Sequence, residues 1–486
     1  MTKPLPDRPL LRRHHHPWPM EGEVRDLVVT QGAIPDDLTG TLYRIGPNLR
    51  YAPLNGRYNG WMGDGMIHAL VLAGGKAHYR NKWVRTPKWL AEDRAGRAVF
   101  DYVLPEKSLL AIGMEVTRPT PESTGVAQGA CNTSVTVHGD ELIAWGEGQS
   151  TPMTVDGRTL ETLGPAPWAT ALPASMTPKV DGYGFGGGHP RVCPVTGEVL
   201  FTTIDVDAPY VTVHVLDPTT CALRSYALDS PYPSYIHDFM ITVDHAVIVV
   251  SPITMSQDRV LGGGGLMGWE PDRGTHVAVM RRADGHTVWI EADENFYDLH
   301  ALNAFVDADR VVLDAPEFPI APVPMDGVDP WQQFDGLVSH LVRYELDLGA
   351  RRMKRVPLDD RNMELPQSDR RRQGLPYRYG YGLCSENDLD DYNFDAVIRY
   401  DLERGTQLTH RFAPSDSVCE PLFVARSADG AEDDGYLITY VWHPDEDRSD
   451  AVILAAHALD ADPIATIALP HRVPFTAHGW WGAGIV

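Results

Sequence analysis

The chain has 486 residues, of which 43% are hydrophobic and 22% charged, which is the composition of a folded globular protein. This length is enough for one large β architecture or for two to three ordinary domains. The formal net charge of −24 argues against nucleic acid as a partner and against an electrostatic anchor on anionic lipid, because both need a basic face.

The five cysteines are scattered along the chain, odd in number and without CxxC spacing. We therefore expect reduced thiols in a cytoplasmic protein, and neither a disulfide framework nor a zinc site. No segment approaches the roughly 18 apolar residues of a membrane span, and the polar N-terminus has no apolar run of signal-peptide length. The chain is thus predicted to be cytoplasmic, or at most peripheral to a membrane.

Residues 1–20 are polar and interrupted by proline, which predicts a flexible N-terminal arm ahead of a single domain at 21–486. The run His14–His16 is interpreted as an exposed patch of this arm. Strands are predicted at Thr41–Ile45, after the Gly-Asp-Gly turn of WMGDGMIHAL, and within GGKAHYRNKWVRT. A helix is predicted over Pro87–Phe100, because a proline suits the first turn and good helix formers follow it.

From Val126 onward, short apolar runs of four to seven residues alternate with Asp, Gly and Pro turns. At least ten such units with almost no helical pattern predict an all-β protein. A β-propeller fits best, because its blades are four-stranded units of roughly 40 to 50 residues and about six to eight of them would use the chain. Insertions at 257–274 and 321–341 could cover one face.

Nineteen histidines are present, and four stand out by their local context. Each of these lies beside the start of an apolar run or among glycine and aromatic residues; they are His189, His237, His300 and His478. Their intervals of 48, 63 and 178 residues exclude a local metal finger. Such spacings suit ligands that come from different blades and point at a propeller axis.

Neutral imidazoles suit Fe, Zn, Cu and Ni, and four of them would leave two positions open on an octahedral metal. A metal-bound histidine usually donates its other ring N–H to a carboxylate. Glu147, Glu364 and Glu420 lie in apolar surroundings and are candidates for this role. The residues alone leave the alternative open that the four histidines are hydrogen-bonded separately in the core.

Eight segments, in order, resemble the carotenoid cleavage oxygenase family and together extend from about residue 21 to the C-terminus. They are GTLYRIGPN, the Gly-Asp-Gly of WMGDGMIHAL, CNTSVTVH, GGHPRVCPVTGEV, YIHDFMIT, HALNAF, EPLFVAR and PHRVPFTAHGWW. The resemblance implies a seven-bladed β-propeller with a cap of loops and short helices over one face. It also implies an enzyme that cleaves a C=C bond of a carotenoid or apocarotenoid with O2 to give two carbonyl products.

The same resemblance implies Fe(II) on the propeller axis, without an organic cofactor. The implied ligands are His189, His237, His300 and His478, three of them supported by Glu147, Glu364 and Glu420, and Thr133 of CNTS matches a catalytic position beside the open iron site. An apolar tunnel under the cap would admit a polyene or another apolar alkene together with O2. Segments 104–114 and 260–269 are candidates for peripheral membrane contact at its entrance.

One departure bears on the substrate. The stilbene-cleaving branch of the family carries a lysine immediately before the first glutamate and a tyrosine after the first helix, which hold a phenolate. This chain has Gly146 at the lysine position, and Tyr102 lies one position off the expected tyrosine. Burying a phenolate without a cationic partner is costly, so a polyene is favoured.

Three alternatives remain open at this point. The first is the same cleavage of stilbenes or of phenylpropenes of the isoeugenol type. The second is a non-catalytic polyene-binding propeller, against which the complete set of histidines and glutamates argues. The third is isomerisation that accompanies or replaces cleavage.

Overall fold

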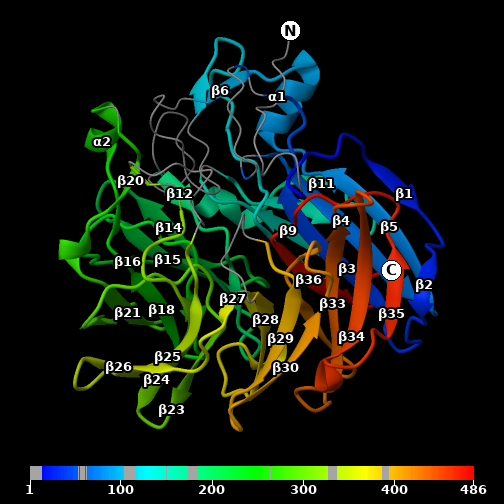
Figure 1. Ribbon diagram of the computed structural model, residues 1–486. Helices are drawn as coiled ribbons and strands as arrows, with labels where there is room; N and C mark the ends of the chain where they lie inside the picture. Colours follow the sequence, from blue (N-terminus) through cyan, green and yellow to red (C-terminus); the bar gives the residue numbers. More distant parts are fainter. Residues whose placement is uncertain are drawn as a thin grey trace.

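The computed structural model describes residues 14–52, 54, 61, 63–102, 117–148, 150–172, 184–262, 264–323, 325–326, 336–385 and 393–486. In these residues seven antiparallel sheets of four to six strands surround one axis, so the predicted all-β fold is confirmed as a seven-bladed β-propeller (Figure 1). The length alone had left the number of blades between six and eight.

The first three blades come mostly from the N-terminal half of the chain. Blade one holds β1 (Gly22–Val24), β5 (Lys76–Trp83), β4 (Gly65–Ala73), β3 (Gly40–Pro47) and β36 (His478–Ala483). Blade two holds β11 (Thr162–Pro165), β10 (Met153–Asp156), β9 (Glu141–Trp145) and β8 (Ser134–His138). Blade three holds β16 (Leu223–Leu228), β15 (Val211–Leu216) and β14 (Val199–Asp205), with β12 (Gly184–Gly186) and β13 (Arg191–Val192) both paired to β14.

The other four blades follow in chain order. Blade four holds β22 (Thr287–Glu291), β21 (His276–Arg281), β18 (His245–Val250) and β17 (Met240–Ile241). Blade five holds β26 (Arg352–Pro357), β25 (His340–Asp347), β24 (Arg310–Glu317) and β23 (Asn303–Asp307), and blade six β30 (Thr406–Arg411), β29 (Ala396–Asp401), β28 (Tyr379–Ser385) and β27 (Asn362–Ser368). Blade seven holds β2 (Val29–Gly32), β35 (Ala465–Ala468), β34 (Arg448–Ala455) and β33 (Gly435–His443), with β31 (Ser417–Val418) and β32 (Leu422–Ala425) both paired to β33.

Two strand exchanges close the ring. The C-terminal strand β36 pairs with β3 in blade one, and the N-terminal strand β2 pairs with β35 in blade seven. Both ends of the chain are therefore tied into blades built mainly by the opposite end. Closure of this kind leaves only short, protected sheet edges.

The strand patterns follow from the stacking of neighbouring blades. The middle strand β18, HAVIVV, is buried at five of six positions because another blade packs on each face. Strand β5, KAHYRNKW, lies between β4 and the edge strand β1 of blade one. Its positions alternate between buried and more exposed. Between blades four and five, Val249 and Val277 pack in one apolar cluster with Val311 and Val342. These apolar interfaces hold the blades at fixed angles around the axis.

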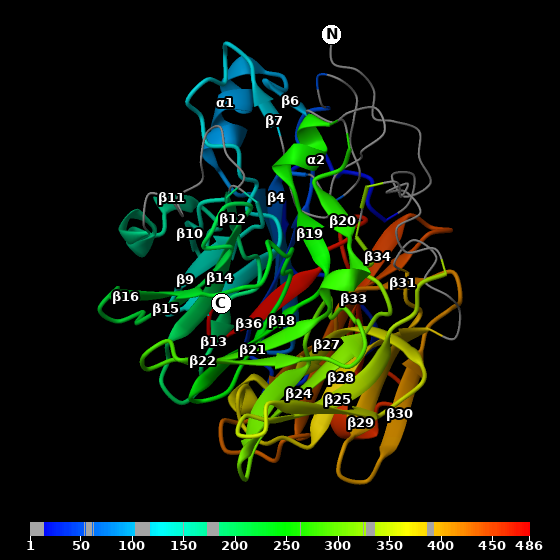
Figure 2. The ribbon, with the colours of Figure 1, turned by 90° about the vertical axis from the view of Figure 1, so that its left-hand side faces the viewer.

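A cap rises above the blades on one face, at the top of Figures 1 and 2. It contains α1 (Pro87–Ala95), α2 (Gln257–Leu261), the pair β6 (Phe100–Tyr102) and β7 (Thr117–Pro119), and the pair β19 (Ile253–Met255) and β20 (Met267–Trp269). Short 3-10 turns lie at Pro167–Ala171, Pro271–Arg273, Arg370–Arg372 and Ala456–Ala458. No helix among the described residues is long and apolar enough to cross a membrane.

The helix predicted over Pro87–Phe100 exists but ends earlier. The Thr86 side chain accepts a hydrogen bond from the Trp89 backbone N–H and caps the N-terminus. Gly96 adopts a left-handed conformation with φ of 64° and ends the helix after Ala95. The apolar residues up to Phe100 belong instead to the approach to β6.

The N-terminal histidines correct one expectation. His14 and His15 are each only 4% exposed, so the predicted exposed patch at His14–His16 is wrong for these two residues. The His14 ring stacks on Trp442, and its Nδ1 lies 3.0 Å from Ser417 Oγ in blade seven. The predicted flexible arm at 1–20 and its boundary stay a prediction, because residues 1–13 lie outside the described part.

Candidate metal centre

Every blade contributes a candidate residue. Blade two also contributes Glu147, which follows β9, and the other seven share one position in their sheets. Each of these lies at the start of an edge strand of its sheet, or within three residues of that start. In blade order they are His478, Thr133, His189, His237, His300, Glu364 and Glu420. The propeller thus brings together residues that are up to 345 positions apart in the sequence, and this arrangement explains the long intervals between the histidines.

The four histidines form one buried cluster. Their ligand atoms all lie within 4.8 Å of one another. His237 is central in it, because its Nε2 lies 3.0 Å from that of His189 and 3.2 Å from that of His300. His237 lies in a segment without regular secondary structure, three residues before β17.

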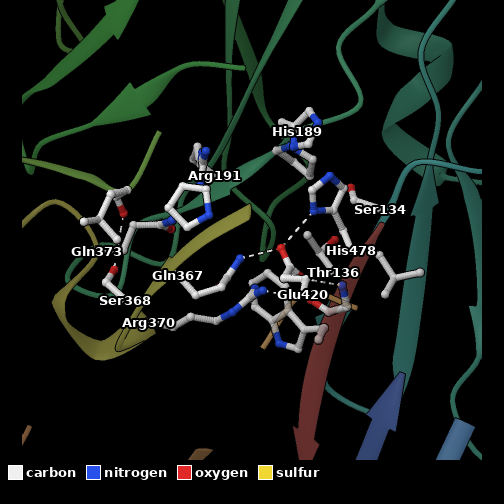
Figure 3. Close-up of a pocket in the computed structure, with 16 residues that line it drawn as sticks. Ser134, Thr136, His189, Arg191, Gln367, Ser368, Arg370, Gln373, Glu420 and His478 are labelled. Atoms are coloured by element: carbon white, nitrogen blue, oxygen red, sulfur yellow. Dashed lines mark hydrogen bonds and ion pairs between the residues drawn. The ribbon is translucent and has the colours of Figure 1, made fainter. Parts of the chain in front are cut away.

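Three glutamates face the outer nitrogens of three of these rings. The Nδ1 of His237 lies 2.5 Å from Glu147 Oε1, and the Nδ1 of His300 lies 2.6 Å from Glu364 Oε2. The third pair joins the Nδ1 of His478 to Glu420 Oε1 at 2.9 Å (Figure 3). Because a carboxylate accepts a hydrogen bond, each Nδ1 carries the proton and each Nε2 has a bare lone pair.

This donor set fits a divalent metal. Bare nitrogen lone pairs at 3.0 and 3.2 Å repel one another unless a cation lies between them. Burial lowers the pKa of His189 and of His478, which favours the neutral imidazoles that metals bind. Burial acts the same way on His300, but the Glu364 carboxylate outweighs it and raises the pKa of His300.

Thr133 lies beside this cluster, next to the residue that precedes His189. A Cβ on Gly188 would lie 2.5 Å from Thr133 Cγ2 and 2.9 Å from Glu147 Cγ, so only glycine fits between them. The structure gives Gly188 a specific part, because it allows Thr133 and Glu147 to approach the first histidine.

Sequence reasoning left Asp238 without a role, and the structure supplies one. Its carboxylate accepts hydrogen bonds from the Phe239 backbone at 2.7 Å and from the Ala301 backbone at 3.0 Å, and it pairs with Arg191. Asp238 therefore ties the segment that carries His237 to the segment that carries His300. The adjacency of Asp238 to His237 was the only signal of this in the sequence.

Two further polar contacts of the glutamates were not predicted from the sequence. Tyr235 OH donates to Glu147 Oε2 at 2.8 Å, and Gln367 Nε2 donates to Glu420 Oε1 at 2.7 Å. Both side chains fix the carboxylates that orient the imidazoles. Neither could be found from the sequence, because tyrosine and glutamine in strands are common and carry no spacing signal.

The fold and this cluster define a class: a seven-bladed β-propeller with a buried cluster of four histidines that could hold a metal ion. A family model described as retinal pigment epithelial membrane protein matches residues 16–483. The chain belongs to this family, which includes the carotenoid cleavage oxygenases. The family resemblance of the eight sequence segments is thereby confirmed.

The relatives fall into two substrate groups. The chain is 32% identical over 463 residues to the apocarotenoid-15,15'-oxygenase of Synechocystis sp., covering 93% of this chain and 92% of the relative. It is 29% identical to an isoeugenol monooxygenase of Pseudomonas nitroreducens, covering 96% of each. A crystal structure of Pseudomonas brassicacearum lignostilbene dioxygenase superposes with a TM-score of 0.86 at 27% identity, covering 99% of this chain and 100% of that one.

A cobalt-substituted structure of the Synechocystis enzyme is also similar, with a TM-score of 0.82 and 28% identity, covering 98% of each chain. The named relatives are oxygenases, so this chain is an enzyme of a family that cleaves C=C bonds with O2.

Proposed function

We propose that this chain is an Fe(II)-dependent oxygenase that cleaves a C=C bond of a carotenoid or apocarotenoid into two carbonyl products. The cluster of His189, His237, His300 and His478 would hold the iron through Nε2 atoms. Four neutral nitrogen donors suit a first-row divalent metal and leave coordination positions open. Iron bound there would supply the activation of O2, while the alkene supplies the electrons.

The chain's own residues would hold and shield this site. Glu147, Glu364 and Glu420 orient three imidazoles, and Asp238 fixes the spacing of two of the segments that carry them. Thr133 lies beside Gly188 and would narrow the approach to the open side of the metal. The buried apolar cluster that includes Tyr235, Phe239 and Leu299 would limit the access of water to the reacting double bond.

The proposal of an apolar substrate rests on Gly146. A Cβ at this position would lie 2.8 Å from both the Cα and the N of Cys131 and 2.6 Å from Ser150 Oγ. The Cys131 main chain therefore occupies the space that the Cβ of a lysine would need. A phenolate at this point would thus lack the lysine that holds it in the stilbene-cleaving branch.

A prediction follows for the variant Gly146→Lys. Because the Cys131 main chain must move, we expect the variant to lose about 1–3 kcal/mol of stability and to gain no cleavage of hydroxystilbenes. Thermal denaturation and a product assay measure the two effects. Gly22→Ala is the control, because a Cβ there meets nothing within 4 Å. An unchanged melting temperature together with new hydroxystilbene cleavage would contradict this account of the position.

The second candidate is cleavage of a stilbene or of an isoeugenol-type phenylpropene. The similarity in fold to the lignostilbene dioxygenase, with a TM-score of 0.86, is the observation that favours it. A non-catalytic propeller has less support, because all four histidines and three glutamates are in place.

A substrate panel separates these candidates. Purified, iron-loaded protein is incubated in air with an apocarotenal, a 4-hydroxystilbene and isoeugenol, and the carbonyl products are identified by mass spectrometry. We expect two carbonyl fragments from the apocarotenal and at least about tenfold slower release from the phenolic alkenes, as expected for an unpaired buried charge. Cleavage of the stilbene alone would transfer the proposal to the second candidate, and a geometric isomer without fragments would indicate isomerisation.

We also propose a cytoplasmic location with peripheral membrane contact through the cap. Segment 104–114 lies outside the described residues. In the other candidate segment, 260–269, Leu261 at the end of α2 is 77% exposed, which supports the contact without testing it. Flotation of the intact protein with neutral lipid vesicles, compared with Leu261→Ser, measures it.

A further inference from the structure

A polar cavity adjoins the four-histidine cluster on the side of His189 and His478. It has a volume of about 60 Å³, enough for a few water molecules, and Glu420 and Gln367 form part of its wall (Figure 3). Two guanidinium groups, those of Arg191 and Arg370, line it as well. Arg191 is paired with Asp238, so the two charges of that pair cancel.

Arg370 has no such partner. Among the described residues no carboxylate lies within ion-pair distance of its guanidinium, and its Nε is buried without a hydrogen bond. The group is held by two contacts to β36: Nη2 donates to the Gly479 carbonyl at 2.8 Å, and the guanidinium carbon lies 3.6 Å from the centre of the Trp480 ring. A buried cation in this setting is costly unless opposite charge lies nearby.

The nearest opposite charge belongs to the metal centre. The Gly479 N–H donates to Glu420 Oε2 at 3.0 Å, so one residue bridges Arg370 to the carboxylate that holds His478. Burial lowers the pKa of Arg370 to about 10, with Glu420 acting in the opposite direction. The guanidinium is therefore still charged at neutral pH.

A charge count shows what this cation balances. Three glutamates contact the imidazoles and carry three negative charges, whereas a divalent metal carries two positive charges. The centre is thus left with one excess negative charge in a buried environment. Two buried guanidinium groups that pair with no carboxylate among the described residues offset this excess at Glu420. They are that of Arg44, whose Nη1 donates to the Glu420 carbonyl, and that of Arg370.

We propose that Arg370 is a counter-charge of the metal centre, together with Arg44, and that it favours the ferrous over the ferric state of bound iron. This inference rests on the proposed iron site. A nearby positive charge disfavours the oxidation state with the higher positive charge, and the groups around a site control its redox potential. Arg370 would act on the metal through its charge alone. It is therefore not a catalytic residue but one that tunes the metal site.

The test compares air oxidation of Fe(II)-loaded wild type with Arg370→Gln, Arg370→Lys and Arg371→Gln. In the absence of alkene, one electron passes from iron to O2, and the ferric product is followed by electron paramagnetic resonance. One unit charge over roughly 10 Å at an effective dielectric constant of about 20 changes such an equilibrium by on the order of tenfold. We expect the ferric signal of Arg370→Gln to grow about three- to tenfold faster, because the rate takes a part of this equilibrium shift, with Arg370→Lys close to wild type.

Arg371→Gln is the matched control, because it removes the same charge one residue away from Arg370. The Arg371 guanidinium pairs with Asp369. Iron content and circular dichroism melting are measured for every variant. Oxidation of folded, iron-loaded Arg370→Gln at the wild-type rate would overturn the inference, as would equal acceleration in Arg370→Lys or Arg371→Gln. A wild-type protein that takes up no iron would instead overturn the proposed function.

Discussion

Replacing His237 by alanine is expected to abolish iron binding and alkene cleavage together. His237 is the ring whose Nε2 lies within 3.2 Å of two other ligand nitrogens, and it connects Glu147 and Tyr235 to the cluster. Its removal takes away one of four donors and leaves Glu147 buried without its imidazole. We expect iron to fall from about one per chain to less than about a tenth, and activity to fall at least about a thousandfold.

The matched control is His286→Ala, which removes an exposed imidazole from the turn before β22. It should retain both iron and activity. Metal analysis by mass spectrometry and the carbonyl product assay measure the two quantities on the same samples. Unchanged iron content in the His237→Ala variant would show that the cluster is not the metal site, even if activity were lost.

Replacing Glu364 by glutamine is expected to weaken metal binding about 10- to 100-fold while the fold persists. Glu364 Oε2 lies 2.6 Å from His300 Nδ1, and the residue is fully buried in β27. The amide keeps the shape of the side chain but removes the negative charge that strengthens the imidazole as a donor. Titration of the apoprotein with Co(II), followed by visible absorption, measures the affinity; a similar enzyme has been determined in a cobalt-substituted form.

Glu345→Gln serves as the control for this variant, because Glu345 pairs with Arg310 on the surface of blade five. It should leave Co(II) affinity unchanged. Equal affinities for Glu364→Gln and wild type would mean that the carboxylate does not tune the ligand, and the part assigned to all three glutamates would then need revision.

The fold was predictable because its signals are local and repeated. Alternating strands with Asp, Gly and Pro turns indicate a propeller, yet blades of unequal size, such as the six-stranded blade seven, prevent length from fixing their number. The four histidines were predictable only as candidates, since their residue types and intervals are compatible with separate core positions. The resemblance to a family decided between a shared metal site and separate core positions.

Other features depend on contacts that no local pattern encodes. Gln367 contacts Glu420, and Arg370 contacts Gly479, each across more than 50 residues of sequence. Their position beside the centre therefore follows only from the closed ring. The burial of His14 has the same origin, because its partners Trp442 and Ser417 lie in the last blade. Polar residues in a proline-rich N-terminus favour an exposed tail until such a docking surface is known.

We propose above all that four histidines on the propeller axis hold one Fe(II). Anaerobic purification of the wild-type protein, followed by metal analysis and protein quantification on the same sample, tests it most directly. We expect about one iron per chain, removed by a chelator and restored by Fe(II) together with alkene cleavage. Cleavage by protein that contains no iron, or that contains zinc in its place, would contradict it.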